Sequence, residues 1–284
     1  MRNGGHALDA DAPSRRLLAH ALRRGTTMKK NAFVTGGSRG IGAGIVRVLA
    51  ESGYDVAFTY NSQAEAAEAV QKDVTALGSR CFYYQASLHE DGVPEKITAR
   101  AISDLGGIDL LVCNAGLTRH NTLLTLTQEF IDFLYKLNFR SYLLCAKTAA
   151  TDMVNRGAKG NIIFITSTRG IRAYPEDAIY GGLKSALNRA AESMALDMAK
   201  HNIRVNCIAP GATAVRGDFS GESLKSGAFA ERIPLKRYGS PREIGYLVKY
   251  MASDEAAYMT GNIVKLDGGL ILPGMPETNK KIEI

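Results

Sequence analysis

Short apolar segments that alternate with helical patterns constrain the fold of this chain more than any other feature of its sequence. Each of the first six segments is followed by a helical pattern, and a seventh closes the series. The segments are residues 31–35, 54–60, 80–85, 108–114, 161–166, 204–209 and 262–266. The alternation requires crossover connections and hence a parallel sheet, and the continuous apolar runs indicate strands that are buried on both faces. The sequence therefore predicts a single-domain α/β fold, a doubly wound (Rossmann-type) parallel sheet of about seven strands with helices on both faces.

The helices expected between these strands differ in how clearly the sequence marks them. An Ala/Glu-rich pattern predicts a helix over residues 63–77, and longer patterns predict helices over residues 128–155 and 177–200. Pro94 and Pro241 are placed to open two further helices, because proline is tolerated in the first helical turn. In such a fold the ligand lies at the carboxyl edge of the strands.

The two ends of the chain lack this pattern. Residues 1–27 are rich in Arg, Ala and Leu, yet two aspartates argue against a transit peptide, and no apolar run there is long enough for a signal-peptide core. We expect residues 1–27 to be a disordered extension, residues 28–273 to be the catalytic domain, and residues 274–284 to be a C-terminal tail.

Composition limits what the chain can bind. No apolar run approaches the ~20 residues that span a bilayer, so we expect no membrane association. The formal net charge of +7 suits an anionic cofactor or substrate. The sequence has no cluster of Lys and Arg interleaved with aromatic residues, the pattern that would indicate nucleic-acid binding. The cysteines lack the spacing of a metal site, so we expect reduced thiols in a cytoplasmic protein, without disulfides or bound metal. They are Cys81, Cys113, Cys145 and Cys207.

A glycine-rich stretch, T-G-G-S-R-G-I-G, lies between the first expected strand and its helix. Its glycines, Gly36, Gly40 and Gly42, are not spaced as in G-x-G-x-x-G. Glycines at this place still allow a tight turn and let a pyrophosphate approach the amides at the start of a helix. The stretch therefore predicts a dinucleotide site.

The end of the second strand indicates which dinucleotide binds. An acidic residue at this place bonds the adenosine ribose and repels a 2′-phosphate, but here the strand ends in T-Y-N-S. Arg39 lies in the glycine-rich stretch, where the alternative is a solvated surface arginine. We therefore predict NADP(H) in preference to NAD(H), with Arg39, Asn61 and Ser62 facing the 2′-phosphate.

Tyr180 and Lys184 are four residues apart, a spacing that places the phenol and the ammonium on one face of a helix. A tyrosine with an ordinary pKa of about 10 is a poor acid or base near neutral pH, whereas a neighbouring ammonium favours the phenolate. Such a pair could exchange a proton with a carbonyl or alcohol oxygen. On its own this spacing is also a common accident.

These features together resemble the short-chain dehydrogenase/reductase family over residues 30–272, with likeness to its 3-oxoacyl-carrier-protein reductases and glucose dehydrogenases. N-A-G at residues 114–116 is similar to the family's motif after the fourth strand, and P-G at residues 210–211 to its nicotinamide-side turn. Ser167 precedes Tyr180 by 13 residues, the usual family spacing. The resemblance implies a catalytic tetrad of Asn138, Ser167, Tyr180 and Lys184.

The resemblance also implies a role for each member of the tetrad. Tyr180 would be the acid/base, and Lys184 would lower the pKa of Tyr180 and hold the nicotinamide ribose. Ser167 would hydrogen-bond the substrate oxygen, and Asn138 would hold a water that links Lys184 to solvent. The implied cofactor contacts are Gly36, Ser38, Arg39, Gly40, Ile41, Gly42, Asn61, Ser62, Ser87, Leu88, Asn114, Ala115, Gly116, Tyr180, Lys184, Pro210, Gly211 and Thr213.

Two cofactor positions depart from the family pattern. Ser87 stands where an aspartate usually contacts the adenine, and a serine can still form a hydrogen bond there. Val215 stands where a threonine is frequent, so the available hydroxyl is that of Thr213.

The reaction that the resemblance implies is NADP(H)-dependent interconversion of a ketone and a secondary alcohol. The substrate alternatives are a 3-oxoacyl thioester, a sugar and a hydroxysteroid. Residues 213–237 read as a mobile lid that selects the substrate. We expect four residues at the pocket mouth, namely Thr168, Arg169, Arg172 and Tyr174. A catalytically silent NADP-binding sensor is disfavoured, because the tetrad is complete.

Partners are implied more weakly. A substrate bound to an acidic carrier protein is favoured by four basic residues, which equally fit solvated helix ends: Arg156, Lys159, Lys200 and Arg204. The family commonly pairs the helices that bear Asn138 and Tyr180, so we expect a homodimer or homotetramer. Gly181 and Gly182 would then allow close packing against the neighbouring subunit.

Overall fold

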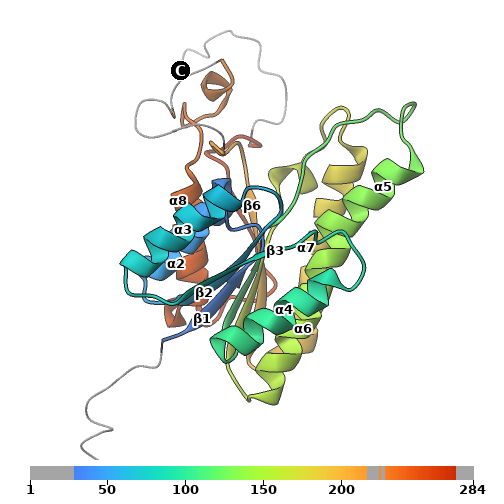
Figure 1. The fold of residues 1–284 in the computed structure, drawn as a ribbon. Coiled ribbons are helices and arrows are strands. Elements are labelled where there is room, and N and C mark those ends of the chain that lie inside the picture. Colours follow the sequence, from blue (N-terminus) through green and yellow to red (C-terminus); the bar gives the residue numbers. More distant parts are fainter. Residues whose placement is uncertain (1–28, 216–223, 225–227, 273–284) are drawn as a thin grey trace, which may run out of the picture.

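The computed structural model describes residues 29–215, Leu224 and residues 228–272, so the expectations for residues 1–27 and 274–284 lie outside it. Within the described residues, the strands form a seven-stranded parallel sheet in the order β3-β2-β1-β4-β5-β6-β7 (Figure 1). The strands are β1 (Asn31–Val34), β2 (Asp55–Tyr60), β3 (Cys81–Gln85), β4 (Leu110–Cys113), β5 (Gly160–Ile165), β6 (Ile203–Pro210) and β7 (Ile263–Leu266). This architecture confirms the predicted doubly wound fold.

Helices cover both faces of the sheet (Figure 1). One face carries α2 (Gly40–Glu51), α3 (Ala64–Ala76) and α8 (Pro241–Ala252), and the other carries α4 (Val93–Leu105), α6 (Ser141–Asn155) and α7 (Ala178–Ala199). The helix α5 (Gln128–Tyr135) leads into α6. No helix among the described residues is long and apolar enough to cross a membrane.

The core has two halves, one on each side of the sheet. Phe33 packs with the α4, α6 and α7 side, whereas its neighbours Ala32 and Val34 pack with the α2, α3 and α8 side. All three side chains are fully buried. Because successive strand residues point to opposite faces, a strand covered on both sides must be apolar at every position. This is why the central strands β1 and β4 read as continuous apolar runs.

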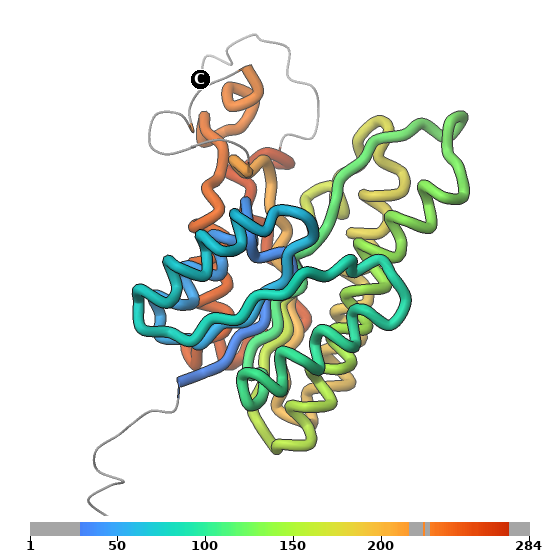
Figure 2. Tube along the Cα trace, viewed as in Figure 1, coloured from blue at the N-terminus to red at the C-terminus, as the bar shows by residue number. Residues whose placement is uncertain are grey.

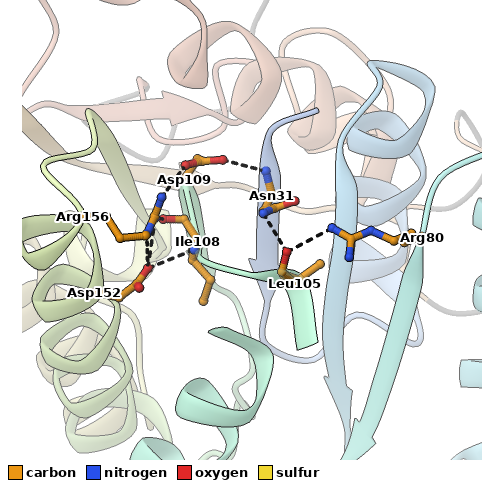
Figure 3. Close-up of polar contacts among 7 residues, drawn as sticks. All are labelled: Asn31, Arg80, Leu105, Ile108, Asp109, Asp152 and Arg156. Atoms are coloured by element: carbon orange, nitrogen blue, oxygen red, sulfur yellow. Dashed lines mark hydrogen bonds and ion pairs between the residues drawn. The ribbon is translucent and has the colours of Figure 1, made fainter. Parts of the chain in front are cut away.

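The amino edge of the sheet is closed by polar side chains (Figure 3). Asp109 accepts from the Asn31 amide at 2.9 Å and pairs with Arg156 at 3.4 Å. Arg156 also pairs with Asp152 and donates to the carbonyl of Ile108. The edge therefore ties β1, β4 and α6 together at the end of the sheet that faces away from the expected site.

Candidate active site

The sheet reverses its winding between β1 and β4, which are neighbours, so the loops that follow these two strands lie side by side. The Asn114 and Ala115 amides donate to Thr35 Oγ1 at 2.9 and 3.0 Å. The Asn114 side chain donates to the carbonyls of Thr35 and Gly36, both at 3.0 Å. The side-chain amide of Asn114, expected at the cofactor, thus donates to the glycine-rich loop, and N-A-G braces that loop.

The glycine-rich loop is shaped as a cradle. Gly36 and Gly40 have positive φ values of 68° and 51°, which side chains rarely adopt. A Cβ on Gly42 would lie 1.9 Å from the Gly36 carbonyl oxygen. The residue that caps α2, Arg39, makes no side-chain bond to the first turn, which contains no acidic residue. Exposed amides at a positive helix end are what a pyrophosphate binds, so the loop fits a dinucleotide.

The expected adenosine side lies at the ends of β2 and β3. Asn61 and Ser62 are exposed, as is Arg39. Ser87 donates to Asn61 Oδ1 at 3.3 Å, which joins the two strand ends. The structure therefore brings two of the predicted adenosine-side residues, Asn61 and Ser87, together, whereas a third, Leu88, is buried.

The expected nicotinamide side follows β6. Pro210 is the last residue of that strand, the Gly211 amide donates to Leu266 at 3.0 Å, and the Thr213 hydroxyl donates to the Gly211 carbonyl at 3.3 Å. Val215 lies within 3.2 Å of a Cβ placed on Gly40, so this turn passes over the glycine-rich loop. Much of the expected lid lies outside the described residues, because residues 216–223 and 225–227 are not described.

Asn138 lies in a π-helical segment, Lys136–Arg140, where the sequence predicts a regular helix from residue 128 to 155. Its buried side chain accepts from the Leu117 amide at 3.1 Å and donates to the carbonyls of Leu117 and Leu134 at 3.2 and 3.3 Å. A Cβ on Gly116 would lie 2.6 Å from Asn138 Oδ1. The wider helical turn thus brings Asn138 against the loop after β4, and the water expected beside it stays a prediction.

Tyr180 meets two hydroxyls at the carboxyl edge. Ser167 lies two residues after the end of β5, and its hydroxyl accepts from the Arg169 amide at 3.1 Å. Burial raises the pKa of Tyr180, while hydrogen bonds with Thr118 and Ser167 act to lower it. Thr118 was not predicted from the sequence. The only signal for it is a hydroxyl residue two positions after N-A-G.

Lys184 is 2% exposed, and burial lowers its pKa to about 7. The ammonium donates to the Ile165 carbonyl at 2.9 Å and to Tyr142 Oη at 3.1 Å, and it lies 5.7 Å from the centre of the Tyr180 ring. The resemblance implies that this lysine lowers the pKa of Tyr180, but in this site burial raises the pKa of Tyr180. Burial explains both directions, because it disfavours the charged form of each group.

An ion pair between half-buried Arg169 and buried Asp177 supports the loop between Ser167 and Tyr180. Arg169 Nη1 lies 3.0 Å from Asp177 Oδ2, and its guanidinium stacks 4.8 Å from the centre of the Tyr174 ring. A Cβ on Gly181 would lie 2.8 Å from the Arg169 carbonyl oxygen, whereas one on Gly182 would meet nothing. The close approach that Gly181 permits is therefore within this chain, whereas the packing of Gly182 against another subunit stays a prediction.

A groove of about 790 Å³ opens beside this pair. It is lined by Arg169, Arg172 and Tyr174, three of the four residues expected at the pocket mouth. The fourth, Thr168, is 3% exposed and donates to the Pro210 carbonyl at 3.3 Å, so it joins β5 to β6 instead. Figure 2 shows the green segment after β4 running beside the yellow segment before α7, where the Asn121 amide donates to Glu176 at 3.0 Å.

Comparisons with known proteins agree with this geometry. The family model described as enoyl-(acyl carrier protein) reductase matches residues 36–271. The 3-oxoacyl-[acyl-carrier-protein] reductase of Staphylococcus epidermidis is 34% identical over 251 residues, which cover 86% of this chain and 100% of that relative. Acetoin dehydrogenase from Salmonella typhimurium has a TM-score of 0.84 at 32% identity, covering 89% of this chain and 99% of the other. A blue fluorescent protein from a metagenomic library, solved in complex with NADPH, has a TM-score of 0.77 at 32% identity, covering 85% and 98%.

Proposed function

Because this chain belongs to the short-chain dehydrogenase/reductase family, we propose that it interconverts a ketone and a secondary alcohol with NADP(H), using Tyr180 as the acid/base. The chain is an oxidoreductase that acts on CH–OH or carbonyl groups with a nicotinamide cofactor. The observation that carries the proposal is the meeting of the Tyr180 phenol with the Thr118 and Ser167 hydroxyls beside buried Lys184.

The chemistry follows from the protonation state of this phenol. A bound nicotinamide ring would supply or accept the hydride. Burial raises the pKa of Tyr180, so the phenol keeps its proton near neutral pH and can give it to a carbonyl oxygen. Ser167 would donate to the same oxygen as charge develops on it. The raised pKa therefore supports the reductive direction.

Residues at the carboxyl edge would hold the cofactor. The cradle of Gly36, Gly40 and Gly42 would take the pyrophosphate, and Lys184 would hold the nicotinamide ribose. We propose a preference for NADP(H), supported by exposed Arg39 and by the absence of an acidic residue in the T-Y-N-S sequence that ends β2. One structural neighbour carries NADPH, which agrees with this choice.

For the substrate, we propose a 3-oxoacyl thioester first, as the name of the curated relative suggests. A small ketone related to acetoin is the second candidate, favoured by the structural neighbour with a TM-score of 0.84. Arg156 and Arg204 are not available to bind a carrier protein, because both guanidinium groups donate to backbone carbonyls. Arg156 is held at the amino edge, and Arg204 donates to the carbonyls of Met259 and Ser253 at 3.0 and 3.3 Å.

We further propose that the chain acts as a homodimer or homotetramer in the cytoplasm, where its free cysteines would stay reduced. Size-exclusion chromatography with light scattering tests the assembly.

The test of the proposed function is oxidation of NADPH, followed by absorbance, with 3-oxoacyl thioesters, acetoin-like ketones, sugars and steroids. Turnover of a ketone is the expected result. Tight NADPH binding without turnover of any carbonyl would instead indicate a silent sensor. Comparing NADPH with NADH in the wild type and in Arg39→Ala tests the cofactor preference, which is wrong if the wild type turns over faster with NADH.

A further inference from the structure

A second phenol lies beside Lys184. Tyr142 is 1% exposed, and its hydroxyl lies 3.1 Å from Lys184 Nζ. The same ammonium lies 4.6 Å from the centre of the Tyr142 ring. Tyr142 is four residues after Asn138, in the first turn of α6, so the π-helical segment that carries Asn138 also sets where this phenol points. Lys184 therefore lies between two tyrosines, and the proposed reaction uses only one of them.

The donors of the lysine can be counted. An ammonium has three protons and no acceptor. One goes to the Ile165 carbonyl at 2.9 Å and one to Tyr142 Oη at 3.1 Å, which leaves a third for the cofactor side. Tyr142 in turn donates to the Ile165 carbonyl at 3.3 Å. The three groups form a closed triangle inside the protein.

Asn138 does not take part in this triangle. Its amide donates to Leu117 and Leu134, and its oxygen accepts from Leu117. Among the described residues, the direct side-chain partner of Lys184 is thus Tyr142.

A hydroxyl differs from a carbonyl, which is the other partner of Lys184. A carbonyl can only accept, so it satisfies the ammonium and leaves a neutral amine without a donor. A hydroxyl accepts from the ammonium and can turn to donate to the amine nitrogen. This matters here because Lys184 has a pKa of about 7 and populates both forms near neutral pH.

We propose that Tyr142 is a positioning residue for Lys184, whose hydroxyl keeps the lysine hydrogen-bonded both as ammonium and as amine. This inference rests on the proposed function for its catalytic consequence, because the lysine must stay in place while its proton is exchanged. The hydrogen-bonding statement itself concerns only Lys184 and Tyr142.

The other groups that face Lys184 do not titrate in the same range. Cys113 comes from β4, Cys207 from β6, and Tyr180 lies one turn earlier on α7. Burial raises the pKa of each, that of Cys207 to about 12, and it raises the pKa of Tyr142 as well. A titration near neutral pH at this place therefore reports on Lys184.

The experiment compares Tyr142→Phe with Tyr84→Phe. Each variant loses one buried hydroxyl and keeps the ring. Tyr84 lies on β3, away from the site, and its hydroxyl donates to Asp104 at 2.8 Å. Tyr84→Phe therefore controls for a general loss of stability. The readout is the ¹³Cε resonance of Lys184 against pH in the free protein, assigned with Lys184→Arg.

The titration midpoint of Lys184 should fall by about 1 pH unit in Tyr142→Phe, because a bond to the charged form is stronger than one to the neutral form. It should not move in Tyr84→Phe. The limb of the pH profile of kcat/KM that depends on charged Lys184 should move to lower pH together with this midpoint. An unchanged midpoint in Tyr142→Phe would overturn the proposal.

Two further outcomes separate the proposal from its premises. If Tyr142→Phe does not fold, the test is the chemical shift of Tyr142 ¹³Cζ in the wild type, measured against pH. It should change with the same midpoint as Lys184, and a shift that does not change with pH overturns the proposal. If the wild type turns over no ketone, the proposed function fails, while the NMR titration still decides the role of Tyr142.

Discussion

At the amino edge of the sheet the charged side chains are paired, whereas at the carboxyl edge buried Lys184 has no carboxylate partner among the described residues. Arg156 pairs with Asp109 and Asp152 (Figure 3). Arg80 pairs with Asp55 at 2.6 Å. In the part of the chain that the structure describes, Lys184 is bonded only to a carbonyl and a phenol. A buried charge without an opposite charge costs free energy. The comparison suggests that one edge stabilises the fold and the other holds the chemistry at the expense of stability.

The largest expected effect is on the carboxyl edge. Tyr180→Phe removes the proposed acid/base, so kcat should fall by roughly 10³-fold, within the range for general acid–base catalysis. The free energy of unfolding should change little, because the ring remains. Turnover and NADPH affinity measured on the same sample check this. A variant that stays active shows that Tyr180 is not the acid/base.

The next effect is a gain of stability. The pKa of Lys184 is lowered to about 7, whereas an unfolded lysine titrates near 10.5, and this difference corresponds to an upper bound of roughly 5 kcal/mol. Lys184→Met should therefore raise the free energy of unfolding at pH 6 by about 3 kcal/mol while activity is lost.

The pH dependence of that gain has a defined sign. Below pH 7 both the folded and the unfolded wild type carry the charge, and the folded state bears the whole cost. Between pH 7 and 10.5 only the unfolded state stays protonated, so wild-type stability rises with pH. Urea unfolding should show the advantage of Lys184→Met shrinking over this window, and a constant advantage would contradict the lowered pKa.

At the amino edge we expect a smaller effect, a loss of stability without a loss of activity. Asp152 accepts from the Ile108 amide at 3.0 Å and from Arg156 at 3.0 Å, and Asp152→Ala leaves both donors without this acceptor. The free energy of unfolding should fall by about 2 kcal/mol, with kcat unchanged. Asp152→Asn, which keeps an acceptor, is the matched control and should lose less. A loss of kcat without a loss of stability would break the contrast between the edges.

The smallest expected effect lies in the ion pair beside Tyr180. Asp177 raises the pKa of Tyr180 and Arg169 lowers it. Asp177→Asn should therefore move the Tyr180 limb of the pH–rate profile to lower pH, and Arg169→Gln should move it to higher pH. Shifts of the same sign in both variants would show that the substitutions act by changing the loop conformation and not by removing a charge.

Regular features of the site could be predicted from residue order alone. The glycine-rich stretch, N-A-G and Ser167 each lie within two residues of the end of a buried strand, and parallel strands bring their carboxyl ends to one edge. Thr118 and Tyr142 could not be found in this way. Thr118 lies in an irregular loop, and Tyr142 comes from a helix whose turn is widened just before it. Neither position follows from a period of two or 3.6 residues.

The sequence by itself determined the sheet, its order of elements and the pairing of Tyr180 with Lys184, because these depend on local periodicity and on the side chains carried by one helix. Only the tertiary structure decided how each group is charged. Burial keeps the proton on Tyr180 and takes the lysine to a pKa of about 7, and it places Tyr142 against the same ammonium. Desolvation depends on what packs around a group from distant parts of the chain, and no spacing in the sequence records it.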